Sequence, residues 1–212
     1  MISIEEARQY YSDHDPAHGF DHVLRVWRLA QRIGQKEGAN MEILQAAVLL
    51  HDIARVHQGS RHTCHAQLGA QMARKILAGH PPELVERVAE AIAQHRFRGK
   101  QKPSSLEAQI LYDADKLDAI GAIGIARAYA IAGARRQKLW APVPSSYINR
   151  PPHEGKGDLE SAEHTPIHEY LFKLAKLKNT LYTETAKQIA EERDRFMRGF
   201  FERLDREVAG EL

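Results

Sequence analysis

The sequence predicts an all-α protein, and three observations support this fold class. Apolar residues recur at three- and four-residue spacing along several segments, as in Phe20, Val23, Leu24 and Trp27. No run of alternating polar and apolar residues is long enough to indicate a sheet. Glycine and proline stand between the periodic segments, where helices end. A chain of 212 residues with 43% hydrophobic residues can bury a sizeable core.

The predicted helices follow one another along the chain. Ser3 is expected to cap a short helix that ends near Tyr11. A largely apolar helix over residues 41–54 is expected to be buried on most sides. Residues 133–165 contain several prolines and no helical period, which predicts a long loop before two closing helices. The remaining helices are predicted at residues 18–37, 66–77, 82–95, 104–117, 125–132, 168–178 and 183–208.

Composition and charge narrow the class of protein. A net charge of +2 gives no global field that would recruit nucleic acid or a membrane. A single cysteine, Cys64, excludes an internal disulfide and suits a reducing cytoplasm. The N-terminus carries charge where a signal peptide needs an apolar core, and no apolar run has the length of a membrane span. We therefore expect a cytoplasmic protein with no membrane partner.

The strongest functional signal is the apolar run over residues 45–54, which ends in His51 and Asp52. Such groups are costly to bury without a partner. His22 upstream and Asp115 downstream offer further ligands, so we expect these four residues to meet at one divalent metal ion. Their two nitrogens and two oxygens suit Mn, Fe, Co, Ni or Mg better than a structural zinc site, which prefers thiolates. Taken singly, each residue also fits a structural role, either as a hydrogen-bonded core histidine or as a helix cap.

The order of these residues resembles the HD-domain superfamily of metal-dependent phosphohydrolases. The resemblance is greatest to single-domain bacterial HD hydrolases of this length, in the branch related to nucleotide pyrophosphatases. It implies one HD-domain helical bundle over residues 1–212, with a core at 18–132, a loop at 133–165 and closing helices at 166–208. It also implies the same four residues as metal ligands. The matching stretches are His18-Gly-Phe-Asp-His22, Ala47-Val-Leu-Leu-His51-Asp52-Ile53, His65-Ala-Gln-Leu-Gly69-Ala70 and Asp113-Ala-Asp115-Lys-Leu-Asp118-Ala-Ile-Gly121.

Under this resemblance, Asp118 lies one helical turn after Asp115 and would face the same cavity, where it could orient water or accept a proton. The alternative for Asp118 is an ion pair with an arginine or lysine on a neighbouring helix. Asp52 and His95 complete the predicted catalytic set.

Four cations are predicted to neutralise substrate phosphate beside the ion, because guanidinium groups match phosphate oxygens: Arg25, Arg96, Arg98 and Lys116. The alternative is a solvated turn whose cations complement helix dipoles. Residues 140–144, with Tyr147 and Arg150, are expected to cover the site and stack a base.

A second metal ion is the other open alternative, with His57, His62 and His65 as its candidate ligands. The sequence lacks the adjacent His-His pair of the binuclear cyclic-dinucleotide branch of the superfamily. We therefore expect a single ion.

The predicted function is a metal-dependent phosphohydrolase acting on a small phosphorylated molecule, a nucleotide first of all, by monoester or phosphoanhydride cleavage. The alternative is a nucleotide-sensing or regulatory module that uses the same pocket with little or no turnover. Nucleic-acid binding through residues 96–102 is disfavoured, because one short basic loop gives little contact area. The exact substrate, the native metal and the presence of a homodimer stay open.

Overall fold

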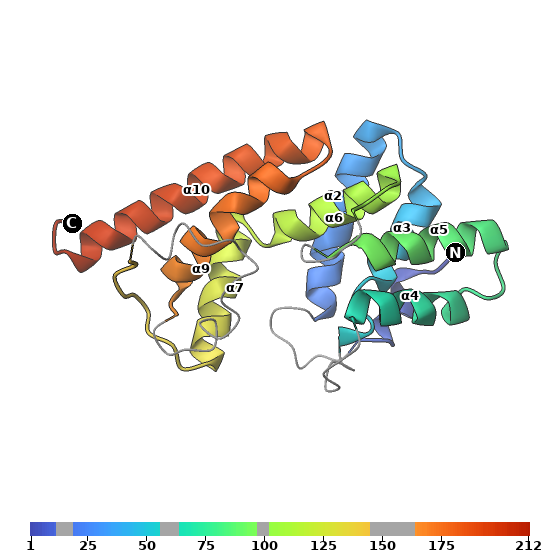
Figure 1. Cartoon of the computed structure of the whole chain (residues 1–212), viewed down its shortest axis with the longest axis horizontal. Coiled ribbons are helices and arrows are strands. Elements are labelled where there is room, and N and C mark those ends of the chain that lie inside the picture. The colour runs from blue at the N-terminus through green and yellow to red at the C-terminus, as the bar shows by residue number, and fades with distance from the viewer. Residues whose placement is uncertain (12–18, 56–63, 97–101, 145–163) are drawn as a thin grey trace. The chain divides into compact units, whose positions relative to one another are not determined.

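The computed structural model contains only helices, turns and irregular segments in the residues that it describes, so the all-α prediction is confirmed (Figure 1). The described residues are 1–11, 19–55, 64–96, 102–144 and 164–212. The sequence predictions for His18, His57, His62, Arg98, Tyr147 and Arg150 fall outside them.

The described residues form two compact units. The first comprises Met1–Lys116 and Leu181–Ala186, and the second comprises Leu117–Thr180 and Lys187–Leu212. A single domain over residues 1–212 stays a prediction.

The first unit is built from six helices in its described part. Within it, α2 packs on α3, α3 packs on α5, and α4 packs on α5, so that α3 is enclosed by its neighbours. These helices are α1 (Ile4–Arg8), α2 (Phe20–Glu37), α3 (Met41–Leu50), α4 (His65–Ile76), α5 (Pro82–Gln94) and α6 (Leu106–Asp118), the last continuing two residues beyond the unit.

Helix α3 is buried along its length, as its apolar sequence predicts. Asn40 caps it by accepting hydrogen bonds from the backbone N–H groups of Glu42 and Ile43. Gly34 of α2 allows the close approach of the two helices, because a Cβ there would lie 2.6 Å from Leu44 Cδ2. A Cβ at this position would therefore require the Leu44 side chain to shift.

Helix α3 ends at Leu50, four residues earlier than predicted, and a tight turn carries the chain from there to Arg55. Carbonyl groups in the last turn of a helix lack intrahelical partners. Here the Tyr11 hydroxyl donates to Leu49 O at 2.9 Å, and His51 Nδ1 lies 2.8 Å from Val48 O. These two side chains satisfy the helix end, and the His-Asp pair occupies the turn that follows.

The second unit contains α7 (Gly121–Ala134), α9 (Pro166–Phe172), the 3₁₀ helix η3 (Leu174–Thr180) and most of α10 (Glu184–Val208). Helix α7 begins four residues earlier than predicted, at Gly121, whose φ of +77° is readily adopted by glycine. The single helix predicted over 168–178 is wrong in detail. The backbone of Lys173 leaves helical geometry and separates α9 from η3.

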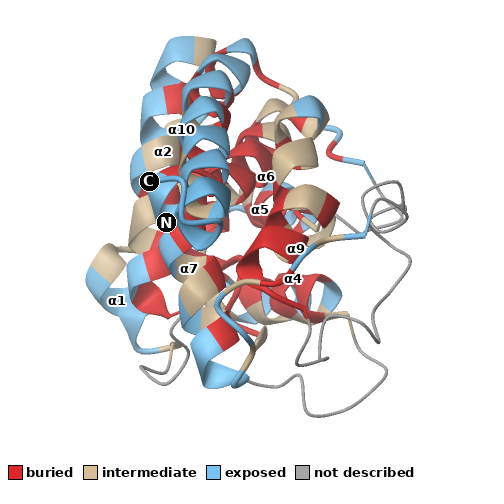
Figure 2. Ribbon diagram, turned by 90° about the vertical axis from the view of Figure 1, so that its left-hand side faces the viewer, coloured by how far each residue is buried: buried red, intermediate tan, exposed pale blue. Residues whose placement is uncertain are grey.

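Helix α10 buries one stripe and exposes the remainder to solvent, as Figure 2 shows. On its buried side Phe201 stacks on Tyr170 of α9, with 4.5 Å between ring centroids. Arg203 and Glu207 form an ion pair on its exposed side. The long loop predicted from residue 133 begins two residues later, because α7 continues to Ala134, and residues 135–144 carry no helix.

No single helix in the described ranges has both the length and the apolar composition needed to cross a membrane. Among the described helices, only the bent pair of α6 and α7, taken together, meets these two criteria.

Asp113 of α6 is fully buried and holds the segment that leads into α10. Its carboxylate accepts hydrogen bonds from Tyr182 N at 2.9 Å, Thr183 N at 2.8 Å and Thr183 Oγ1 at 2.7 Å. Residues far apart in sequence are thereby joined within the first unit.

Replacement of Asp113 by alanine is expected to lower the free energy of unfolding by about 2–4 kcal/mol, because two backbone N–H groups and a hydroxyl lose their acceptor. Urea denaturation measures the loss. Asp21→Ala is the matched control, since the Asp21 side chain is 69% exposed and its removal should change stability by less than about 0.5 kcal/mol. Equal losses in the two variants would contradict the role given to Asp113.

Candidate metal centre

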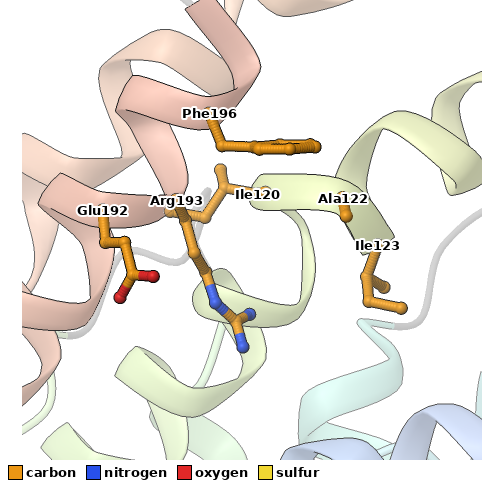
Figure 3. A pocket seen from close by; sticks show the side chains of 7 residues that line it. Ile120, Ala122, Ile123, Glu192, Arg193 and Phe196 are labelled. Carbon is orange, nitrogen blue, oxygen red and sulfur yellow. The ribbon is translucent and has the colours of Figure 1, made fainter. Parts of the chain in front are cut away.

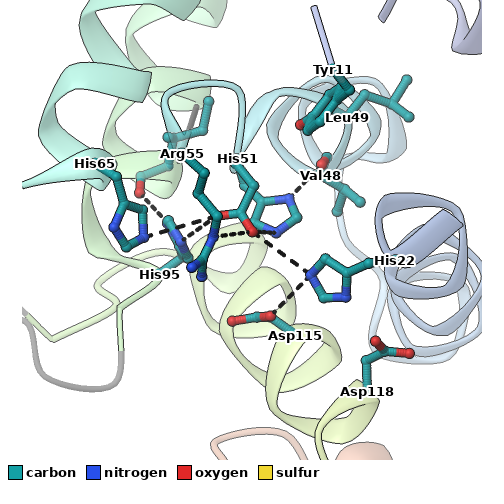
Figure 4. A network of polar contacts seen from close by, with 12 residues as sticks. Tyr11, His22, Val48, Leu49, His51, Arg55, His65, His95, Asp115 and Asp118 are labelled. Atoms are coloured by element: carbon teal, nitrogen blue, oxygen red, sulfur yellow. Dashed lines mark hydrogen bonds and ion pairs between the residues drawn. The ribbon is translucent and has the colours of Figure 1, made fainter. Parts of the chain in front are cut away.

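Side chains from five segments of the first unit converge at the end of α3 (Figure 4). Asp52 lies among them, with only 2% of its surface exposed to solvent. The converging residues are His22 of α2, His51 and Asp52 of the turn after α3, His65 at the start of α4, His95 at the end of α5 and Asp115 of α6.

The four predicted metal ligands lie together. Asp52 Oδ2 is 3.4 Å from His51 Nε2 and 3.8 Å from His22 Nε2. Asp115 Oδ1 is 3.5 Å from the same nitrogen of His22. Ligand atoms bound at about 2.0–2.2 Å to one ion stand roughly 3–4 Å apart. The geometry therefore suits the predicted ligand set, whose role as ligands stays a prediction.

Asp52 also belongs to a second group of potential ligands. Its other oxygen, Oδ1, lies 3.6 Å from His95 Nε2 and 3.9 Å from His65 Nε2, and one ligand atom from each of the three residues lies within 4.8 Å of the others. The sequence pointed to His65 as a ligand of a second ion but assigned His95 to catalysis. Both assignments stay predictions, as does the number of ions.

Two histidines of the centre have a defined tautomer. His51 Nδ1 lies 2.8 Å from Val48 O, and His95 Nδ1 lies 2.6 Å from Ile92 O. A carbonyl oxygen can only accept, so Nδ1 carries a proton in both rings, and in the neutral form of each ring the lone pair lies on Nε2.

These lone pairs are buried without a hydrogen-bond donor. Within the described residues, neither Nε2 of His51 and His95 nor Oδ1 of Asp52 has a hydrogen-bond partner. Buried polar atoms are normally paired. A divalent cation would satisfy such a set of acceptors, so the residues present fit a metal ion.

The charge states of the centre also suit a metal. Burial lowers the pKa of His51 to about 4 and that of His65 to about 3, so both imidazoles are neutral at pH 7. Burial alone raises the pKa of the Asp52 carboxyl, but His51, His95 and Arg55 together hold it well below its usual value. Neutral imidazoles and ionised carboxylates are the forms that bind metals.

Asp115 is ionised for a similar reason. Burial raises the pKa of its carboxyl, and the Lys116 ammonium and His22 outweigh that effect and hold the pKa well below the usual value. Lys116 Nζ lies 2.5 Å from Asp115 Oδ2 and 3.4 Å from His95 O.

The predicted phosphate-binding cations occupy different surroundings. Lys116 is buried beside the centre, 5.0 Å from the centroid of the Tyr112 ring. Arg96, which follows His95, donates to Cys64 Sγ at 3.2 Å. Arg25 of α2 forms an ion pair with Asp21 at 2.5 Å. Contact of any of these cations with phosphate stays a prediction.

Asp118 is the last residue of α6 and belongs to the second unit. Its buried carboxylate accepts a hydrogen bond from Arg127 of α7 at 3.0 Å. This ion pair is the alternative that the sequence left open for Asp118. A catalytic role for its carboxylate stays a prediction.

The sequence predictions missed one residue that touches the centre. Arg55 donates through Nε to Asp52 Oδ2 at 2.6 Å. The signal was present, because residues three apart in a helical turn lie on one side.

The second unit has a separate pocket, shown in Figure 3, which is lined by none of the predicted site residues. Its lining residues are Ile120, Gly121, Ala122, Ile123, Glu192, Arg193 and Phe196.

Comparison with known proteins identifies the family. The sequence model of the HD-domain family matches residues 19–120, which contain every residue of the centre. YpgQ of Bacillus subtilis, itself described as uncharacterized, is 33% identical over 203 residues, which cover 94% of this chain and 88% of YpgQ. The chain belongs to the HD-domain family.

Solved structures agree with this assignment. The structure of B. subtilis YpgQ in complex with ADP has a TM-score of 0.74 at 28% identity, covering 98% of this chain and 99% of that one. A predicted HD superfamily hydrolase from an uncultured Thermotogales bacterium has a TM-score of 0.66 at 30% identity, covering 97% of this chain and 90% of that one. At the level of the superfamily, these neighbours support a metal-dependent hydrolase.

Metal analysis tests the ligand set. Protein equilibrated with Mn²⁺ and then desalted is expected to retain about one ion per chain, and Asp52→Ala to retain almost none, because Asp52 belongs to both ligand groups. Elemental analysis gives the stoichiometry. His80→Ala, which removes a half-buried imidazole between α4 and α5, is the control and should retain the ion. Full retention by Asp52→Ala would refute the centre. Two ions in the unaltered chain and one in His65→Ala would replace the single-ion prediction.

Proposed function

We propose that this protein is a metal-dependent phosphohydrolase that acts on a small phosphorylated molecule, a nucleotide in the first instance. The observation that carries the proposal is the buried cluster of imidazoles and carboxylates at the end of α3, in which Nε2 of His51 and of His95 has no hydrogen-bond partner among the described residues.

His22, His51, Asp52 and Asp115 would hold the divalent ion in this proposal, and Mn, Mg, Co, Ni or Fe suits such ligands. When bound, the ion supplies Lewis acidity and activation of water, the two functions that phosphate-ester hydrolysis requires.

The remaining roles fall to residues beside the centre. Lys116 stands against Asp115 and would offer positive charge to a phosphate, as would Arg96 next to His95. The neutral form of His95 has its lone pair on Nε2 and could accept a proton there, if His95 is not itself a ligand. Arg25, Arg98 and Asp118 complete the proposed set.

The nucleotide assignment is supported by one relative. YpgQ, which is similar to this chain over nearly its whole length, has been solved in complex with ADP. Binding of a nucleoside diphosphate to YpgQ agrees equally with a nucleotide sensor, so product analysis must separate the two functions for this chain.

The proposal predicts turnover of at least one member of a panel of nucleoside mono-, di- and triphosphates in the presence of Mn²⁺, Co²⁺, Ni²⁺ or Mg²⁺. Asp52→Ala should lower kcat by roughly a thousandfold or more, since loss of the ion removes several kcal/mol of transition-state stabilisation. Chromatography identifies the products and so distinguishes monoester from anhydride cleavage. Binding of a nucleotide with no product under any of the four metals would favour the sensor.

A further inference from the structure

The two carboxylates of the predicted ligand set are each paired with a cation. Lys116 Nζ lies 2.5 Å from Asp115 Oδ2, and Arg55 Nε lies 2.6 Å from Asp52 Oδ2. Each carboxylate therefore faces one side-chain cation at ion-pair distance. The charge of the carboxylates is thus already compensated by the chain itself.

The two ion pairs differ in whether the carboxylate oxygen held by the cation is also the oxygen that faces the histidines. Lys116 holds Oδ2 of Asp115, whereas Oδ1 of that carboxylate faces His22 Nε2 at 3.5 Å. An ion beside His22 could therefore bind Oδ1 while Lys116 keeps its partner.

On Asp52, by contrast, Arg55 and the two histidines face the same carboxylate oxygen. Arg55 donates to Oδ2, the same oxygen that lies 3.4 Å from His51 Nε2 and 3.8 Å from His22 Nε2. The second oxygen, Oδ1, is directed to His95 and His65 instead. A cation bound between His22 and His51 would therefore compete with the Arg55 guanidinium for Asp52 Oδ2.

We propose that Arg55 is a resident counter-cation of the centre, which a divalent ion displaces from Asp52. Two like charges a few ångströms apart repel strongly where water is scarce. The Arg55 side chain is 26% exposed and lies at the rim of the centre, so it can turn away while Asp52 stays in place.

The displaced guanidinium has an evident use, and this second half of the inference rests on the proposed function. Its planar fork matches two phosphate oxygens, and its carboxylate partner has then been taken by the ion. Metal binding would thereby convert Arg55 from a partner of Asp52 into a positioning residue for substrate phosphate. Metal loading and anion affinity would rise together.

Calorimetric titration of Mn²⁺ into the metal-depleted protein tests the first half without any turnover. Arg55→Gln should bind Mn²⁺ about tenfold more tightly than the unaltered chain, because the competing charge is gone. Arg55→Lys, which keeps the charge, should return the affinity toward that of the unaltered chain. Arg74→Gln is the matched control, because it removes an arginine from an ion pair with Glu86 elsewhere in the first unit and should leave the affinity unchanged.

Weaker Mn²⁺ binding by Arg55→Gln would overturn the proposal, because an arginine that only orients Asp52 should cost affinity when it is removed. Unchanged affinity would overturn it as well. Circular dichroism of each variant confirms that the fold is retained.

Equilibrium dialysis with inorganic phosphate at saturating Mn²⁺ tests the second half. Arg55→Gln should bind phosphate about tenfold more weakly, the effect of losing one charged hydrogen bond. Equal phosphate binding would overturn the positioning role. Tighter Mn²⁺ binding in a protein that hydrolyses nothing would uphold the counter-cation and refute only the proposed hydrolysis.

Discussion

Burial of the Asp52 carboxylate is the constraint on which the first unit depends. A charge at 2% exposure must be surrounded by partners, and these come from several elements of the unit. His22 lies on α2, His95 at the end of α5, and Arg55 in the same turn as Asp52. The packing of α2 and α5 on α3 is therefore also the assembly of a charged centre, and apolar burial and polar satisfaction are achieved by the same contacts.

Much of this arrangement was predictable from the sequence, because the signals are local. The apolar run before His51 predicts a buried helix, and α3 is one. Gly38 ends α2 in the left-handed conformation, and Asn40 caps the start of α3, as short-range rules require. The membership of His22 and Asp115 in one cluster followed from resemblance to a family, and spacing alone left it open.

The remainder depends on contacts that no short window of sequence contains. At the end of α3, the hydroxyl of Tyr11, 38 residues away from Leu49, donates to a carbonyl of the last turn. Lys173 divides a helix whose apolar period continues without interruption. Arg127 pairs with Asp118 across nine residues, which one-helix spacing rules do not cover. For Leu49 and Asp118, the side-chain partner lies beyond the reach of local propensity.

The hydrogen bonds between Asp113 and Thr183 have a consequence for biosynthesis. These two residues stand 70 positions apart, and all of residues 117–180 lie between them in the chain. A ribosome must therefore extend the nascent polypeptide through that whole insertion before the anchoring carboxylate meets its backbone donors. Until then the Asp113 carboxylate must be hydrated instead. The core of the first unit is complete only after residues 181–186 have been synthesised.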